Sequence, residues 1–248
     1  MSSWNSGSSA AVKNLSCLLL GVVVFAGCAH AADEATRQTR GNDNRSDAIS
    51  VRTGGSEEGA EAQNATAKTI QLSGRGRQAS EKFVLEPGLS VFTIHHDGDS
   101  NVVVHLLDRE GKSVDTLFNQ IGAFDGERGF AIAEGGQYLL DVAADGQWTI
   151  GIRQPRATEG QAIPRSLEGR GYGVTEFIHL DKGLAVFKMK HQGQGRFTVN
   201  LVDRDGHKVE ALVNELGKFD GSKPINVDKP GTYFLNVAGD GNWTIDVQ

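Results

Sequence analysis

The chain contains an internal repeat: residues Leu72–Ile152 recur, without a gap, at Leu167–Val247. One offset of 95 positions aligns every matching motif. The motif pairs are Asp108–Gly111 with Asp203–Gly206, Phe124–Gly126 with Phe219–Gly221, and Asp145–Ile150 with Asp240–Ile245. A repeat without insertions indicates two copies of one domain. Each candidate residue therefore has a counterpart 95 positions away, called here its twin, against which its role is tested.

Apolar residues alternate with polar ones in several short segments of each repeat, which predicts half-buried β-strands. The clearest inward faces are Tyr138/Leu140/Val142, Trp148/Ile150/Ile152 and Val102/Val104/Leu106, each with its twins. Further strands are expected at 82–85, 89–94 and 130–133, whereas 114–118 and its twin 209–213 fit neither a strand nor a helix. Asp145-Gly146 and Asp240-Gly241 predict tight hairpin turns. Seven or eight strands per repeat predict an all-β chain of two tandem antiparallel β-sandwich domains, of a jelly-roll type.

The N-terminal segment has the pattern of an export signal. Lys13 precedes an apolar run, 15–27, that is too short for a transmembrane helix and typical of a signal peptide. Phe25-Ala26-Gly27-Cys28 resembles a bacterial lipobox, so Cys28 is the expected lipid attachment site; Ala29-His30-Ala31 is the alternative, an ordinary cleavage site. Both readings place the protein outside the cytoplasm, as an outer-membrane lipoprotein in the first case and as a periplasmic or secreted protein in the second.

The remaining chain divides by composition. The signal peptide spans 1–27, and residues 28–68 have almost no large apolar side chains, which predicts a disordered tether. The two repeats follow as 69–153 and 167–248, joined by a linker at 154–166 that contains Pro155 and Pro164.

Charge and cysteine content exclude several classes of function. The formal net charge is −6, whereas a nucleic-acid binder usually has a basic domain or stripe, so no nucleic-acid partner is expected. Both cysteines, Cys17 and Cys28, precede the repeats. The repeats therefore contain neither a disulfide nor a thiol nucleophile.

Three motifs resemble the bacterial pre-peptidase C-terminal domain. They are the stretch Ser80–Gly88 with its Pro-Gly turn, the Asp-x-x-Gly motifs at Asp108–Gly111 and Asp203–Gly206, and Gly-x-Tyr-x-Leu-x-Val at Gly136–Val142 and Gly231–Val237. The resemblance covers both repeats and implies a non-catalytic β-sandwich module of the kind appended to secreted hydrolases. Some members of that family bind calcium or matrix proteins. This chain has Asn101 and Arg196 where many members have an aspartate entering the third strand, and it has no protease domain.

The acidic and histidine motifs favour structural roles. Asp108 with Gly111, and Asp203 with Gly206, resemble the two ends of a hairpin turn; a calcium loop would need further acidic ligands. His95-His96 is the only adjacent histidine pair, and neighbouring strand residues point to opposite faces. We expect no metal and no cofactor.

A few residues remain as ligand candidates. Arg75 and Arg170 are twins within glycine-rich segments and are possible contacts for an anionic ligand, with an ion pair as the alternative. Tyr172 is the better candidate for an exposed aromatic, because Trp148 and Trp243 are in phase with core residues. The remaining motif residues are expected to form turns and core: Tyr138, Tyr233, Asp145, Gly146, Asp240 and Gly241.

No hydrolase signature is present in the sequence, so we predict that the protein is not an enzyme. The favoured function is a non-catalytic cell-envelope binding or adhesion lipoprotein that recognises an envelope polysaccharide or protein and is held at the membrane by a lipid on Cys28. The alternative is a structural or accessory protein that assists a secreted hydrolase.

Overall fold

A computed structural model of the chain describes residues 69–248. The expectations for the signal peptide, the lipid attachment at Cys28 and the tether lie outside the described residues. Within residues 69–248, no helix is long and apolar enough to cross a membrane.

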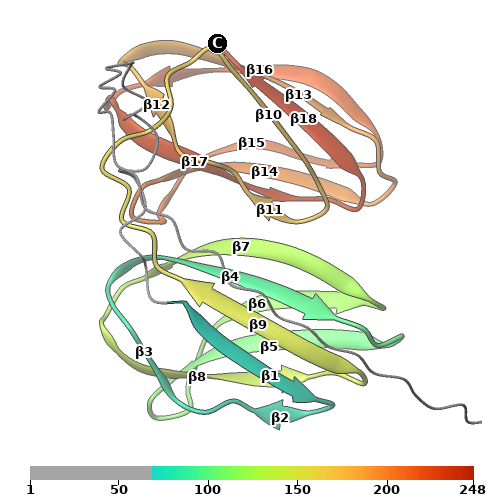
Figure 1. The fold of residues 1–248 in the computed structure, drawn as a ribbon. Helices are drawn as coiled ribbons and strands as arrows, with labels where there is room; N and C mark the ends of the chain where they lie inside the picture. Colours follow the sequence, from blue (N-terminus) through green and yellow to red (C-terminus); the bar gives the residue numbers. More distant parts are fainter. Residues whose placement is uncertain (1–68) are drawn as a thin grey trace, which may run out of the picture. The chain divides into compact units, whose positions relative to one another are not determined.

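The first repeat folds into two antiparallel sheets (Figure 1). One sheet has the order β1-β9-β4-β7 and the other β2-β8-β5-β6, with β3 pairing beside β2 on β8. The strands are β1 (Ile70–Arg75), β2 (Gln78–Ala79), β3 (Phe83–Leu85), β4 (Gly88–His96), β5 (Asn101–Asp108), β6 (Ser113–Ile121), β7 (Phe124–Ile132), β8 (Gly136–Ala143) and β9 (Gln147–Arg153).

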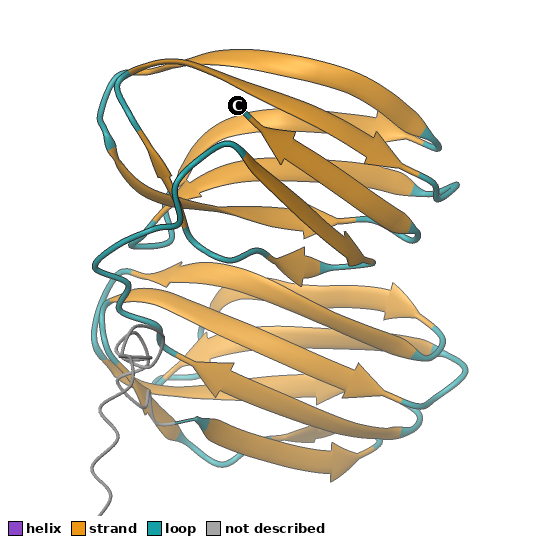
Figure 2. Cartoon of the chain, turned by 45° about the horizontal axis from the view of Figure 1, so that its top comes forward, coloured by secondary structure: helices purple, strands orange, loops and turns teal. Residues whose placement is uncertain are grey.

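The second repeat has the same topology at the same offset. Its sheets have the orders β10-β18-β13-β16 and β11-β17-β14-β15, with β12 pairing on β17. The strands are β10 (Arg165–Arg170), β11 (Gly173–Val174), β12 (Ile178–Leu180), β13 (Gly183–His191), β14 (Arg196–Asp203), β15 (Lys208–Leu216), β16 (Phe219–Val227), β17 (Gly231–Ala238) and β18 (Asn242–Val247). Strands and loops account for all the described residues (Figure 2). The predicted all-β tandem sandwich is confirmed. Most successive strands lie in different sheets; the exceptions are β2–β3 and β5–β6 and their counterparts in the second repeat.

Each sandwich encloses its own hydrophobic core, built from the alternating residues of both sheets. The predicted inward faces are buried in both repeats: Trp148 is 1% exposed and its twin Trp243 is 5%, while Ile150 and Ile245 are both 0%. At about 25 cal/mol per Å² of apolar surface removed from water, this burial is the main stabilising term of each sandwich.

The segments 114–118 and 209–213, which the sequence left undecided, are strands. They belong to β6 and β15, and their pairing with β5 and β14 has two register shifts in each repeat. A bulge inserts an extra residue and breaks the period-2 pattern. Two consecutive residues, Leu117 and Phe118, are consequently both buried, which explains why the spacing fitted neither template.

The prediction of hairpins at Asp145-Gly146 and Asp240-Gly241 is wrong. β8 and β9 belong to different sheets, as do β17 and β18, so each turn carries the chain from one sheet of the sandwich to the other. Neither glycine has a positive φ. Each is required for a different reason: a Cβ at Gly146 or Gly241 would collide with the backbone of Gly98 or Gly193. Alternation alone predicted the strands but not which sheet each one joins.

Candidate binding site

Asp108 and Asp203 lie at the turns between β5 and β6 and between β14 and β15. The Oδ1 atom of Asp108 accepts backbone N–H bonds from Glu110 at 3.0 Å and Lys112 at 2.9 Å. Asp203 makes the equivalent bonds to Asp205 and His207. The carboxylates therefore close the turns, and Gly111 and Gly206 adopt the positive φ (84° and 95°) that the turns need.

Asp145 and Asp240 anchor the loops that connect the two sheets. Oδ2 of Asp240 accepts the N–H groups of Gln194 at 3.0 Å and Gly195 at 2.8 Å. The Gly195 bond is the main reason why the pKa of Asp240 lies below its usual range. Burial raises the pKa of Asp145, but N–H bonds from Ser100 and Asp99 and the nearby His96 outweigh it, so the pKa of Asp145 is also lowered.

His96 and His191 stand behind these aspartates, with fully buried side chains. Nδ1 of His96 is 3.0 Å from the carbonyl oxygen of Gly122, and its Nε2 is 3.3 Å from Asp145 Oδ1. His191 has the same neighbours in the second repeat. Only Nδ1 of each ring has hydrogen-bond geometry, and each Nε2 is buried without a hydrogen-bond partner within residues 69–248. His95 points outward and is exposed, as strand alternation requires.

The tyrosines and tryptophans of the repeat motifs tie each core to the surrounding loops through hydrogen bonds to backbone carbonyls. Trp148 Nε1 donates to the carbonyl of Gly76 at 3.1 Å, and Trp243 does the same to Gly171. The hydroxyl of Tyr138 donates to the Glu134 carbonyl at 2.6 Å, and Tyr233 donates to Lys229. Burial raises the pKa of both tyrosines. These side chains therefore stabilise the fold.

The sequence-predicted ligand candidates lie in different places. Arg75 is exposed at the end of β1, and Arg170 is exposed at the end of β10. Neither joins any of the ion pairs found within residues 69–248. Arg170 and Tyr172 line one depression together, whereas Arg75 does not line it.

The expectation that Tyr172 is an exposed aromatic is wrong. Its side chain is half-buried against the first sandwich: its ring meets that of Phe124 edge-on, with 5.2 Å between centroids. Its hydroxyl accepts a 2.7 Å hydrogen bond from Gln120, and its carbonyl accepts the N–H of Glu127. Sequence alternation reports which side of a strand a residue occupies and carries no information about a second domain packed outside it.

The two sandwiches meet along a contact called here the seam. Leu89 and Val91 of β4 pack against Val202 of β14 and Phe234 of β17, with Val174 and Phe177 at the margin. At its centre the amide of Asn236 bonds reciprocally to the backbone of Gly129, accepting its N–H and donating to its carbonyl, both at 2.9 Å. All four central apolar residues are at most 1% exposed.

Two depressions beside the seam share Glu127 and Tyr172 as a common wall, and together they form the seam groove. The larger measures about 760 Å³ and takes side chains from both repeats; the smaller measures about 390 Å³ and contains Arg170. Aromatic and amide side chains line the larger part: Phe130, Tyr172, Asn119, Gln120 and Asn200. Sequence patterns did not predict this groove, because its two walls come from different repeats.

Some charged groups in the seam groove are paired, whereas Glu168, Arg170 and Lys208 join none of the ion pairs found within residues 69–248. Arg128 donates to the carbonyls of Thr116 and Leu117 and to Asp115, and Glu127 accepts from Arg153 and Thr93. Asn200 differs, because its Oδ1 is buried and no residue within 69–248 donates a hydrogen bond to it. Asn119 is exposed, and no hydrogen bond holds its side chain among the described residues. Glutamate residues and arginine or lysine residues line the groove in equal number, so the groove combines amides and aromatic surface with little net charge.

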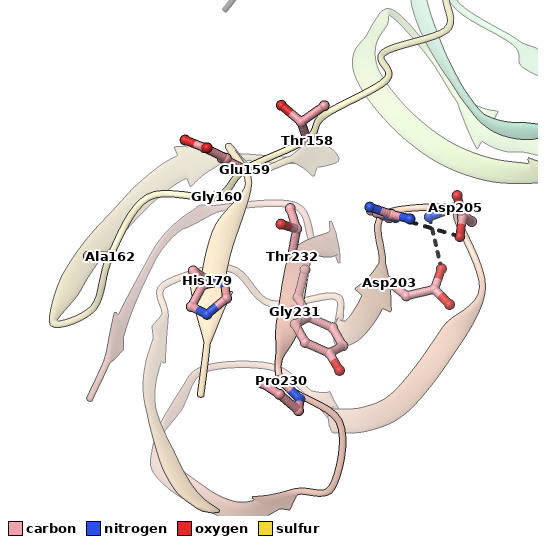
Figure 3. A pocket seen from close by; sticks show the side chains of 12 residues that line it. Thr158, Glu159, Gly160, Ala162, His179, Asp203, Asp205, Pro230, Gly231 and Thr232 are labelled. Atoms are coloured by element: carbon pink, nitrogen blue, oxygen red, sulfur yellow. Dashed lines mark hydrogen bonds and ion pairs between the residues drawn. The ribbon is translucent and has the colours of Figure 1, made fainter. Parts of the chain in front are cut away.

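A further pocket of about 710 Å³ lies in the second sandwich, beneath the linker (Figure 3). The linker is pinned to β12 by two hydrogen bonds between Gln161 and the backbone of Phe177 and His179. Asp203 and Asp205 lie on one side and His179 on the other, but the Asp203 carboxylate is used by its own turn. Nowhere in residues 69–248 do three or more His, Cys, Asp or Glu residues form a cluster able to hold a metal ion.

No protein-family model and no curated protein sequence matches the chain. Among solved structures it is similar to the M60 catalytic domain with the CBM51-1 and CBM51-2 domains from Clostridium perfringens ZmpB, at 6% identity, 71% coverage of this chain and a TM-score of 0.28; the match spans only 33% of that chain. The fucolectin from striped bass (Morone saxatilis) serum has 12% identity, 71% and 83% coverage and a TM-score of 0.23. The N-terminal CBM22-1–CBM22-2 tandem domain from Paenibacillus barcinonensis has 12% identity, 73% and 85% coverage and a TM-score of 0.26. Likenesses this weak identify neither a family nor a ligand for this chain.

Proposed function

We propose that the chain is a non-catalytic binding protein of the cell envelope and that the seam groove is its ligand site. The observation that carries the proposal is the composition of the groove, where aromatic and amide side chains from two repeats converge beside Arg128 and Glu127, which are held in ion pairs. Binding sites form preferentially at domain interfaces, from apolar walls with a few well-placed polar groups.

The ligand class that fits this lining is a neutral polysaccharide of the envelope. A sugar ring offers a C–H face to the rings of Phe130 and Tyr172, and its hydroxyls donate to and accept from amides. Two depressions on either side of Tyr172 suit an extended polymer better than a single sugar.

Titration of the full chain with purified envelope polysaccharides, followed by calorimetry, tests the site. Asn119→Ala removes an amide that no described residue holds, so it leaves the fold intact, and we expect it to weaken binding by about tenfold, the value of one hydrogen bond to a polar ligand group. Asn214→Ala is the matched control, because Asn214 is the twin of Asn119 and bonds to Arg196 outside the groove. Loss of binding in the control alone would contradict the proposal.

The proposal includes attachment to the membrane through a lipid on Cys28. The lipobox-like sequence supports it. Metabolic labelling with a fatty acid should mark the wild-type protein and not Cys28→Ser, and the variant should leave the membrane fraction. An unlabelled wild-type protein that begins at residue 32 would instead support ordinary signal cleavage.

A further inference from the structure

At the seam, the two repeats contribute different faces of the fold that they share. The first sandwich contributes the outer face of the β4–β7 sheet, and the second contributes the outer face of the β14–β17 sheet. Because the repeats are equivalent, each sandwich carries both faces. Within residues 69–248, two faces therefore remain without a partner: the β13 face of the second sandwich, and the β5–β8 face of the first.

These two unpartnered faces keep apolar residues at the positions that form the seam. Leu89 is 1% exposed within the seam, whereas its twin Leu184 is 73% exposed; Val186, the twin of Val91, is only half-buried. On the opposite face, Leu107 and Leu139 are the half-buried twins of Val202 and Phe234. Outward positions of a solvated sheet normally carry polar residues. Apolar residues at these positions on both unpartnered faces therefore favour an interface.

The residues that make the polar contacts of the seam also have twins that could attract one another between two copies of the chain. The hydrogen bond from Gln120 to Tyr172 corresponds to Glu215 and Arg77, which have opposite charges. Arg77 has a 76% exposed side chain and only a 3.9 Å contact to Asp141, while Glu215 is exposed and in no ion pair of the described region. The Phe124–Tyr172 ring contact corresponds to Phe219 and Arg77, a cation–π combination.

We propose that copies of this chain associate head to tail, with the β13 face of one copy packed on the β5–β8 face of the next. In this arrangement Leu184 and Val186 meet Leu107 and Leu139, and Glu215 meets Arg77. The contact repeats the seam between molecules. Because the two faces differ, each pair of copies keeps one free face of each kind, and association continues into chains of copies rather than closed dimers.

One seam contact is missing between copies, which makes their association weaker than the seam. Gly129 and Asn236 exchange two hydrogen bonds, but their twins are Pro224, which has no N–H, and Asp141, which has no donor. The proposed association is therefore reversible and depends on concentration.

Sedimentation velocity of the full chain over a range of concentrations tests the proposal, with all variants in the same buffer and detergent. The wild type should form oligomers beyond the dimer as concentration rises. Leu184→Glu and Leu139→Glu each place a charge in one face, so each variant alone should remain monomeric. Their equimolar mixture should form dimers and nothing larger, because only one intact face of each kind is left. Arg77→Glu should weaken association by about tenfold, and adding Glu215→Arg should restore it.

Leu216→Glu is the matched control. Leu216 is also 73% exposed, and its twin Ile121 remains 81% exposed beside the seam, so this position lies outside the contact. The control should associate as the wild type does. A monomeric wild type at every concentration, or a mixture of the two face variants that stays monomeric, would overturn the proposal. A closed dimer unaffected by Leu139→Glu would also overturn it, because it would require a symmetric contact.

Discussion

The two sandwiches have nearly the same interior and different exteriors. Inward residues match their twins in burial, as Ile150 and Ile245 do at 0%. Outward residues do not: Leu89 is 1% exposed and Leu184 is 73%. A repeated sequence therefore determines which side of a strand a residue occupies, but a neighbouring domain determines whether an outward residue is buried. Twin substitutions separate these two effects.

The largest effect is expected where the repeats are alike. Trp148→Ala and Trp243→Ala each remove a buried ring and a hydrogen bond to a carbonyl, so each should lower the free energy of unfolding by about 3–5 kcal/mol. Urea denaturation followed by circular dichroism measures both. A loss at one tryptophan that is several times the loss at its twin would show that the two cores are not equivalent.

A smaller and unequal effect is expected at the seam. Leu89→Ala leaves a cavity between the sandwiches and should cost about 2–5 kcal/mol. Leu184→Ala, its twin, should change stability by no more than about 0.5 kcal/mol in dilute solution. Equal losses in the two variants would mean that Leu184 is covered even in the monomer, against its 73% exposure.

The interior was predictable from sequence because strand alternation and the core obey the same period. The inward faces through Leu140, Trp148 and Val104 were all recognised and are all buried. The prediction failed at 114–118, where bulges break the period of two. It also failed at Asp145-Gly146, where the chain passes from one sheet to the other. Sheet membership depends on contacts between distant segments, which local patterns do not encode.

The seam and its groove were not predictable for a related reason. Tyr172 and its twin Arg77 occupy the same place in the fold, yet only Tyr172 packs on another domain. Twin positions give one signal. The seam includes positions where the repeats differ strongly in side-chain polarity, such as Tyr172 with Arg77, or in the presence of a backbone N–H, such as Gly129 with Pro224. Such a difference marks a surface where the domains diverge, but it does not show what packs on that surface.

Asn236→Ala and its twin substitution compare a hydrogen-bonded seam position with an equivalent position outside the seam. Asn236→Ala removes both hydrogen bonds to Gly129, which should cost about 1–2 kcal/mol and speed hydrogen exchange of the Gly129 amide. Asp141→Ala, the twin substitution, removes only a 3.9 Å contact to the exposed Arg77 and should cost less than about 1 kcal/mol. Unchanged exchange at Gly129 in the first variant would contradict the reciprocal bond.

The smallest effect is a pH dependence that the two sandwiches should share. The pKa of Asp240 is lowered by the N–H of Gly195, and the pKa of Asp145 is lowered because its N–H bonds and His96 outweigh burial. A carboxylate with a lowered folded-state pKa stabilises the fold above its unfolded pKa, about 3.9, and loses that contribution as the pH falls through the folded value. Asp240→Asn and Asp145→Asn should therefore lower stability at neutral pH and flatten its decline in acid.

Acid titrations monitored by tryptophan fluorescence compare these variants with Asp181→Asn, whose side chain is 92% exposed and contacts only His179. The control should keep the wild-type acid profile. If Asp240→Asn flattens the profile and Asp145→Asn does not, the desolvation of Asp145 cancels its hydrogen bonds, and the two loops differ in energy despite their matching geometry. If neither variant changes the profile, acid sensitivity arises elsewhere, and the aspartates act only as hydrogen-bond acceptors that the asparagine amide oxygen replaces.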